Sequence, residues 1–217
     1  MAKDQDLFKG QDLSGWAGSN DQEHAWEVVG GVALDPADPT RFTTNPGEGV
    51  FYNGSSGRTA DIVSTVTQGD CELHVEFVVP EKSNSGVYVM GLYEIQILDS
   101  WGETDLKYGT CGGVYCQWID EKPVGGTPPR VNASRPAGEW QTYDITFRAP
   151  RFGPSGDKIA NACFEQVVWN EQVVHENVEV EGPTRASLPK PETASGNLML
   201  QGDHGPVAYR NIRVRDL

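Results

Sequence analysis

The chain has 217 residues, and its 17 lysines and arginines against 31 aspartates and glutamates give a formal net charge of -14. Phosphate backbones and anionic lipid surfaces are repelled by such a balance, because binding to both depends on lysine and arginine. No run approaches the roughly 20 consecutive apolar residues that a membrane-spanning helix needs. Nucleic acids and membranes are therefore excluded as expected partners, whereas small neutral molecules such as sugars fit the composition.

The length and the spacing of structure breakers predict a single domain over residues 1–217. The sequence contains no internal repeat, low-complexity tract or charge block that would mark a linker. Loops rich in proline and glycine are expected at 123–129, 150–156 and 182–191. No window of eleven or more residues has a clear 3.6-residue apolar period, so the pattern does not favour helices.

Short runs with strand periodicity recur along the chain. In Cys71–Val79, Leu73, Val75 and Phe77 share one face and alternate with polar residues, which is typical of a half-buried strand. Further strands are expected at 86–90, 93–98, 114–118, 141–149, 162–169, 172–175, 197–201 and 207–214. A tight hairpin turn is expected at 169–172, since asparagine tolerates positive φ. Many short strands separated by turns predict an all-β fold, a two-sheet antiparallel sandwich or jelly roll.

The expected strand at 93–98 has the most informative polar pattern. Glu94 and Gln96 point to the same face, roughly 7 Å apart along the strand. A bulge near Leu98 would bring Asp99 to that face too. The spacing E-x-Q-x-x-D resembles the E-x-D-x-x-E motif of laminarinase-type glycoside hydrolases, with Gln96 in place of an acid and Asp99 in place of a longer one. Two carboxylates on one face suit glycosidic bond chemistry, where one transfers a proton and the other attacks or stabilises charge.

Four separated segments, in the same order, resemble the 3-keto-disaccharide hydrolase family. They are LFKGQDLSGW (7–16), SNSGVYVMGLYEIQILDSWG (83–102), PAGEWQTYDI (136–145), and LQGDHG with YRNI near the C-terminus (200–205 and 209–212). The resemblance runs from about residue 7 to the end of the chain. It implies a concanavalin A-like β-sandwich that acts on 3-keto-glycosides.

A ketone at C3 of a sugar changes which bonds can be broken. It acidifies the proton on C2, so that a base can form an enolate, the group at C1 can leave by β-elimination, and water can add back. The site then needs a carboxylate or imidazole base, donors at the enolate oxygen and an acid for the leaving oxygen. By the resemblance, the catalytic positions fall on Glu94, Asp99 and His204, with base and acid unassigned among them.

Other residues are expected to bind the sugar. Asn84, Gln96 and Gln201 supply amide groups. Trp101 is a candidate stacking platform for the apolar C–H face of a sugar ring, with core packing or a loop anchor as the alternative, and Tyr115 is a weaker candidate. A common form of the last motif reads L-Q-D-H-G, so the extra Gly202 leaves the position of His204 open.

Two other functions remain open from the sequence. A non-catalytic carbohydrate-binding module would have no use for the acidic pair. A conventional glycoside hydrolase, acting on unoxidised glucans through Glu94 and Asp99, is disfavoured by Gln96. No cofactor is expected. A structural Ca²⁺ is left open, since the run 35–38 is acidic but lacks a calcium-loop spacing. The oligomeric state is not predicted.

The cysteines and the start of the chain give little information on compartment. Cys111 and Cys116 lie close enough in sequence for a disulfide, whereas Cys71 and Cys163 are expected as buried thiols. The sequence contains no C-x-x-C pair, so structural zinc is not expected. The chain as written starts without an apolar signal segment. Because members of the resembled family are often exported, a periplasmic or extracellular location is expected, and a cytoplasmic one stays open.

Overall fold

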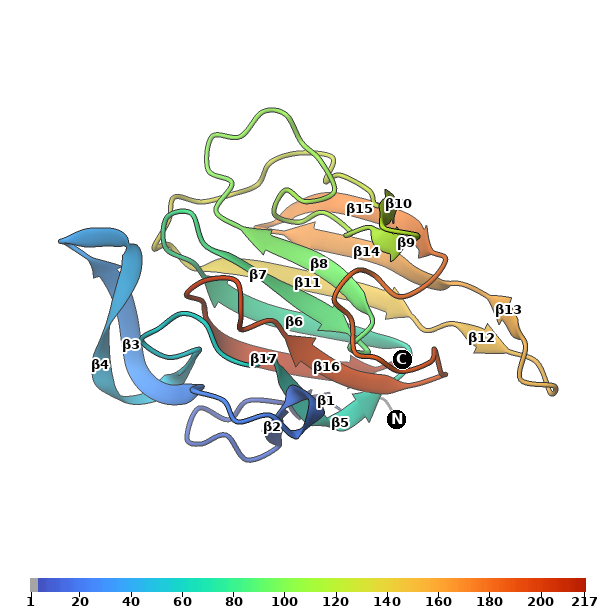
Figure 1. Ribbon diagram of the computed structural model, residues 1–217, viewed down its shortest axis with the longest axis horizontal. Helices are drawn as coiled ribbons and strands as arrows, with labels where there is room; N and C mark the ends of the chain where they lie inside the picture. Colours follow the sequence, from blue (N-terminus) through green and yellow to red (C-terminus); the bar gives the residue numbers. More distant parts are fainter. Residues whose placement is uncertain (1–3) are drawn as a thin grey trace.

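The computed structural model describes residues 4–217, which form two antiparallel β-sheets packed face to face (Figure 1). One 3-10 turn at Ser19–Asp21 is the helical structure of this part of the chain. None of the described segments is a helix long and apolar enough to cross a bilayer. The expected all-β, two-sheet antiparallel sandwich of the concanavalin A-like, jelly-roll class is confirmed.

The larger sheet has the strand order β15-β14-β11-β6-β17-β4-β3, and β1 pairs with β17. Its strands are β1 (Asp4–Asp6), β3 (Glu27–Asp35), β4 (Asp38–Tyr52), β6 (Cys71–Val78), β11 (Gln141–Arg148), β14 (Ala162–Trp169), β15 (Gln172–Val180) and β17 (Ala208–Asp216). The sequence predicted β6, β11, β14 and β17 to within two residues at either end.

The smaller sheet has the order β2-β5-β16-β7-β8 and lies in front of the larger one in Figure 1. Its strands are β2 (Trp16–Gly18), β5 (Ile62–Gln68), β16 (Gly196–Leu200), β7 (Asn84–Val89) and β8 (Tyr93–Leu98). Two separate hairpins complete the strands: β9 (Gln117–Ile119) with β10 (Lys122–Val124), and β12 (Arg151–Phe152) with β13 (Lys158–Ala160).

The core lies between the two sheets and follows the period-2 alternation of the sequence. Leu73, Val75 and Phe77 of β6 are all buried, and on the facing sheet Ile95 and Ile97 of β8 are fully buried. Each such side chain contributes about 1.5–3 kcal/mol relative to an exposed position. This burial fixes the register of β8, so its alternate residues must point outward, away from the core.

Some local expectations are confirmed and others are wrong. Asn170 and Glu171 both have positive φ (47° and 67°) in the β14–β15 hairpin, as a tight two-residue turn requires. The strand expected at 114–118 is wrong, because Val114 makes only isolated bridges to Ile95 and Thr127 and β9 begins at Gln117.

The cysteines do not form the disulfide considered from the sequence. All four are free and buried, which confirms buried thiols at Cys71 and Cys163. The sulfur of Cys111 lies 3.2 Å from the hydroxyl of Tyr143 in the core. Cys116 instead faces Tyr108, outside that core contact. Cys111 and Cys116 therefore lie in different environments, although they are close in sequence.

Candidate active site

The outward face of β8 carries the polar residues singled out in the sequence. Strand β8 pairs with β7 without a register shift, which places Tyr88 opposite Glu94, Gly86 opposite Gln96 and Asn84 opposite Leu98. Glu94 and Gln96 therefore lie on the face of the smaller sheet that points away from the sandwich core. The same face of β7 presents Asn84, Gly86 and Tyr88 beside them.

A cavity of about 260 Å³ opens over this face. Its lining is Asn84, Tyr88, Glu94, Gln96, Tyr115, Arg185, Ala186, Gln201 and His204. Six of the eight residues expected in the site are thus brought together, from four segments distant in sequence. The remaining two, Asp99 and Trp101, line an adjacent cavity of about 470 Å³.

Glu94 is the most strongly perturbed carboxyl group of the site. It is 3% exposed. Burial raises its pKa to about 8; the neighbouring Tyr88 hydroxyl, which favours the charged form, opposes the rise, and the charges of Asp61 and Asp203 add to it. Burial likewise raises the pKa of Asp61 to about 6, against a hydrogen bond of 2.9 Å from the Gly202 N–H. A carboxyl group so tuned can exchange protons near neutral pH.

His204 stands at the exposed rim of the cavity. Its Nδ1 is bound to the carboxylate of Asp203, and the carbonyl of Asp203 accepts a hydrogen bond of 3.0 Å from Arg58. A carboxylate on one ring nitrogen fixes the orientation and tautomer of an imidazole and leaves the other nitrogen for a ligand. The extra Gly202 in the motif does not remove His204 from the cavity.

The buried residue Asn53 holds the His204 loop and was not found from the sequence. Its side-chain amide donates to the carbonyls of Gly202 (3.1 Å) and Gly205 (2.8 Å), and its oxygen accepts from the Val207 N–H (3.0 Å). Asn53 is fully buried. Asparagine in a strand-to-loop stretch is common, so no sequence signal marked it out.

The amide groups of the site offer open hydrogen-bonding positions. The side-chain oxygen of Gln201 is buried and has no hydrogen-bond partner within residues 4–217, while its nitrogen lies 3.4 Å from the Tyr88 hydroxyl. An unsatisfied buried acceptor costs about 1–3 kcal/mol. A ligand hydroxyl at this place would remove that cost. Gln96 differs, since its oxygen accepts from the Ile97 N–H at 3.1 Å.

Arg185 is a residue of the site that the sequence did not indicate. It supplies the permanent positive charge of the lining, and its guanidinium carbon lies 4.0 Å from the ring centroid of Trp118. Within residues 4–217 the guanidinium forms no ion pair with a carboxylate. The residue lies in the loop expected at 182–191, where one arginine among prolines and glycines carries no pattern.

Asp99 occupies a different place from the one considered in the sequence. The bulge that would bring Asp99 to the face of Glu94 is absent near Leu98. The Asp99 N–H instead continues the β7–β8 ladder by donating to the Ser83 carbonyl at 3.0 Å. The Asp99 carboxylate accepts from the Lys82 N–H at 2.9 Å, so it stabilises the turn before β7. Asp99 therefore faces the second cavity, together with Trp101.

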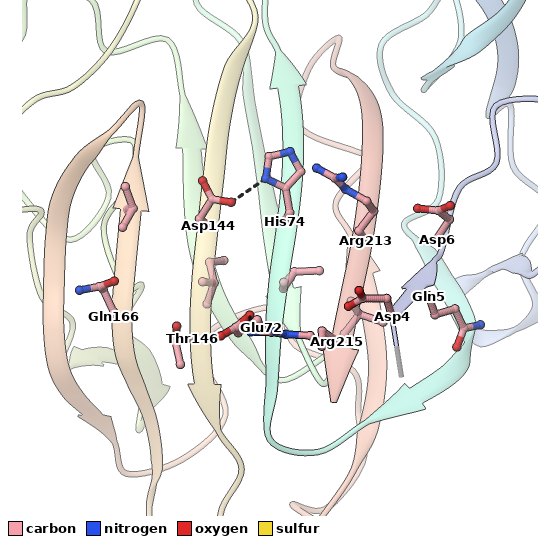
Figure 2. A pocket seen from close by; sticks show the side chains of 14 residues that line it. Asp4, Gln5, Asp6, Glu72, His74, Asp144, Thr146, Gln166, Arg213 and Arg215 are labelled. Atoms are coloured by element: carbon pink, nitrogen blue, oxygen red, sulfur yellow. Dashed lines mark hydrogen bonds and ion pairs between the residues drawn. The ribbon is translucent and has the colours of Figure 1, made fainter. Parts of the chain in front are cut away.

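A larger hollow of about 620 Å³ lies on the outer face of the other sheet (Figure 2). Two pairs of its polar side chains are in contact: His74 lies 2.6 Å from Asp144, and Arg215 pairs with Glu72. None of the expected site residues lines it. The arrangement is typical of a solvated sheet face with cross-strand ion pairs, and we place the functional site at Glu94.

Metal ligation has little support in the described part of the chain. Residues 4–217 contain no group of three or more His, Cys, Asp and Glu side chains placed to hold a metal ion. Asp35 and Asp38, in the acidic run considered for calcium, accept backbone hydrogen bonds from Ala37 (2.8 Å) and Thr40 (3.1 Å). These carboxylates stabilise the β3–β4 turn.

A β-sandwich whose sheet face joins a buried carboxyl, amides, an arginine and aromatic rings in one cavity has the features of a carbohydrate-active enzyme. A family model described as "3-keto-alpha-glucoside-1,2-lyase-like domain" matches residues 3–215. The chain belongs to this family, and it is a carbohydrate-active enzyme.

Solved structures with the same architecture come from Parabacteroides distasonis. One, provisionally named a glycosyl hydrolase, is 29% identical, covers 99% of this chain and 84% of its own, and has a TM-score of 0.71. Two others with the same provisional name are 17% and 21% identical, with TM-scores of 0.66 and 0.59. These cover 99% of this chain and 94% and 100% of their own chains, and they support the fold alone. No curated protein matches the sequence.

Proposed function

We propose that this enzyme cleaves 3-keto-glycosides by elimination and hydration at the cavity around Glu94. The observation that carries the proposal is the buried Glu94 carboxyl, whose pKa is raised to about 8. An ordinary glutamate, whose pKa is about 4.3, is a weaker base than such a carboxylate for removing a proton from carbon next to a ketone. The rate of such a step is greatest when the pKa of the base lies near the working pH.

In the first step, ionised Glu94 takes the proton from C2. The electron pair of that C–H bond forms the C2=C3 bond, and the ketone becomes an enolate with its charge on oxygen. The Arg185 backbone lies at the end of the cavity where Tyr88 and Glu94 pair, since the Tyr88 hydroxyl donates to the Arg185 carbonyl (3.2 Å). The Arg185 guanidinium, which lies over the Trp118 ring, supplies the permanent positive charge of the lining and stabilises the enolate oxygen, where negative charge develops.

In the second step, the enolate returns its electrons and the C1–O bond breaks. The departing oxygen receives a proton from His204, which Asp203 orients. The His204 loop meets the opposite end of the cavity, because a Cβ on Gly205 would lie 3.0 Å from the N–H nitrogen of Asn84. Water then adds to C1 of the enone and gives a proton to His204, and the proton held by Glu94 returns to C2, so that both side chains regain their starting states. The net products are a free 3-keto sugar and an alcohol.

The test is product analysis with matched substrates. Purified protein is incubated with 3-keto-trehalose, 3-keto-sucrose and their unoxidised parents, and products are followed by mass spectrometry. We expect release of 3-keto-glucose from the oxidised substrates alone. In D₂O, unreacted 3-keto substrate should gain deuterium at C2, and Glu94→Gln should abolish both signals. Glu23→Gln, an exposed glutamate outside the cavity, is the control.

The outcomes separate the alternatives. Cleavage of the unoxidised parents would indicate a conventional glycoside hydrolase and overturn the elimination route. Binding of the sugars without turnover of any of them would indicate a carbohydrate-binding module. Unchanged activity in Glu94→Gln would remove Glu94 from the mechanism.

A further inference from the structure

The cavity beside the Glu94 cavity continues the same strand. Tyr115 lines both cavities, and Leu98 of the second cavity lies on the same face of β8 as Glu94 and Gln96. Residues two apart on a strand are about 7 Å apart. The second cavity therefore begins one residue pair beyond Gln96, at the end of the site where the departing group leaves in the proposed function.

Trp101 gives the second cavity an open aromatic face. It is 61% exposed, although the strand β8, which ends nearby at Leu98, is mostly buried. Tyr108 and Tyr115, which also line the cavity, pack edge to face with their ring centroids 5.3 Å apart. Exposed aromatic rings beside a cavity offer stacking surface to the apolar faces of a sugar, and their rigid rings lose little entropy on binding.

The loop that carries Trp101 is held in place by hydrogen bonds. Asn132 donates to the carbonyls of Ser100 (2.7 Å) and Glu103 (2.9 Å), one on each side of Trp101. The Ser100 hydroxyl accepts from the Cys111 N–H at 3.1 Å, which ties the loop to the core. The platform is therefore positioned before a ligand arrives, which lowers the entropic cost of binding.

The charges of the second cavity favour one class of ligand. Three carboxylates, Asp99, Glu103 and Asp105, line it against the single ammonium group of Lys107. Lys107 is itself paired with Asp105 at 2.7 Å. The potential in the cavity is therefore negative, and the whole chain adds a formal net charge of -14. An anionic group placed there would be repelled, while a neutral polar ring would not.

We propose that the second cavity is the subsite for the leaving group, and that it selects neutral or cationic sugar rings, stacked on Trp101, over anionic ones. This inference rests on the proposed function, because it places the bond to be broken between the two cavities. It adds a selectivity that the chemistry around Glu94 does not itself impose.

The experiment compares three substrates that share one 3-keto-glucosyl ring. Their leaving groups are methanol, glucose and glucuronate. In the wild type we expect kcat/KM to be highest for glucose and lower for glucuronate by about tenfold or more, a gap that narrows as salt screens the carboxylates. Trp101→Ala should lower kcat/KM for the glucose leaving group about tenfold and leave the methyl glycoside unchanged. Ile159→Ala, 69% exposed on β13, is the matched control and should change neither.

A charge variant tests selectivity separately from stacking. Asp105→Asn removes one carboxylate and frees Lys107, so kcat/KM for the glucuronate leaving group should rise several-fold relative to that for glucose. Asp120→Asn makes the same change in the β9–β10 turn, outside the cavity, and should have no such effect. An equal loss on all three substrates in Trp101→Ala, or no loss on any, would overturn the subsite.

Failure of the proposed function is recognised independently. If the wild type does not turn over the methyl glycoside, the elimination chemistry fails. The subsite is then decided by calorimetric binding of unoxidised trehalose, and equal affinity in the wild type and Trp101→Ala would overturn the subsite as well.

Discussion

Gly86 lies directly against the carboxylate of Glu94, so that a Cβ at position 86 would come within 2.3 Å of Glu94 Oε1. The same Cβ would lie 2.9 Å from the ring of Tyr88. Real Cβ atoms do not tolerate such approaches, so the Glu94 carboxyl group and the Tyr88 ring would have to shift into the cavity that they line. The glycine in the SNSGVYV segment therefore makes room for the buried carboxyl group.

Gly86→Ala should accordingly damage activity more than stability. The new methyl group displaces the Glu94 carboxyl from the position it holds under the substrate, and a misplacement of about 1 Å can cost 10²-fold in rate. We expect kcat/KM for a 3-keto-glycoside to fall about 100-fold while the circular dichroism spectrum stays that of the wild type. Gly31→Ala, where a Cβ has no neighbour closer than 4.0 Å, is the control and should retain activity. Wild-type activity in Gly86→Ala would contradict this role.

The raised pKa of Glu94 predicts how the rate depends on pH. If ionised Glu94 is the base, log kcat/KM should rise with pH below about 8 and level off above it. A 4-nitrophenyl 3-keto-glucoside isolates this ionisation, because its leaving group departs without protonation. A rate that falls through pH 8 would instead identify Glu94 as the acid. A plateau from pH 5 upward would show that the carboxyl group titrates as an ordinary glutamate.

The same ionisation should reduce stability at high pH. The folded pKa of Glu94 is raised from 4.5 to about 8, so between these values the unfolded chain binds fewer protons than the folded one. The free energy of unfolding therefore falls as pH rises through this window, with no penalty below 4.5 and the full penalty above 8. Glu94→Gln removes it, and its Tm should exceed that of the wild type by more at pH 8.5 than at pH 5.

Calorimetry measures the size of this difference in Tm between Glu94→Gln and the wild type. For a chain of this length, each 1 kcal/mol shifts Tm by about 2–4 °C. Asp61, with its pKa raised to about 6, contributes a slope of the same sign at lower pH in both proteins. Glu23→Gln, at an exposed glutamate outside the cavity, is measured alongside as the control. A Glu94→Gln difference that stays constant between pH 5 and pH 8.5 would refute the raised pKa.

The fold was predictable where the hydrophobic alternation was regular. In β6 and β11, buried residues alternate with polar ones, so sequence and structure agree. The long β3–β4 hairpin escaped prediction because Asp38–Tyr52 contains proline and glycine and is mostly exposed. Its strands are stabilised by pairing with each other, and in Figure 1 the hairpin stands at one side of the sandwich. Pairing of that kind leaves no periodic apolar signal.

The site was predictable where its residues share one strand or one motif. Glu94 and Gln96 follow from the alternation of β8, and His204 from its motif. Asn53 and Arg185 could not be found, because each acts through contacts with residues about 100 or more positions away, such as Val207 and Tyr88. Long-range contacts of single polar residues in loops carry no local pattern.

Because all four cysteines are free and buried, we expect reductants to leave the stability of the folded protein unchanged. Burial raises the pKa of Cys71 and of Cys111 to about 12, so neither forms a reactive thiolate near neutral pH. Ellman's reagent should react with none of the cysteines in the native protein and with all four after unfolding in guanidinium chloride. Two reactive thiols after unfolding would show that a disulfide exists. A Tm that falls on addition of dithiothreitol would show the same.

Trp118 should position Arg185 without contacting the substrate. Its ring lies 4.0 Å from the guanidinium carbon, and such a contact is worth about 0.5–1 kcal/mol at an exposed site. In Trp118→Ala the guanidinium of Arg185 loses its contact with the ring, so it lies beside the enolate oxygen for a smaller fraction of the time. Because the guanidinium stabilises charge that develops on the ketone oxygen during proton removal and is absent from the bound substrate, we expect kcat to fall about 3–5-fold with KM little changed. Trp140→Ala is the matched control, since Trp140 makes the equivalent contact to Arg210 at 4.1 Å, outside the cavity. Trp118→Phe keeps an aromatic face and should recover most of kcat. Equal losses of kcat in Trp118→Ala and Trp140→Ala would show that the effect is one of general stability.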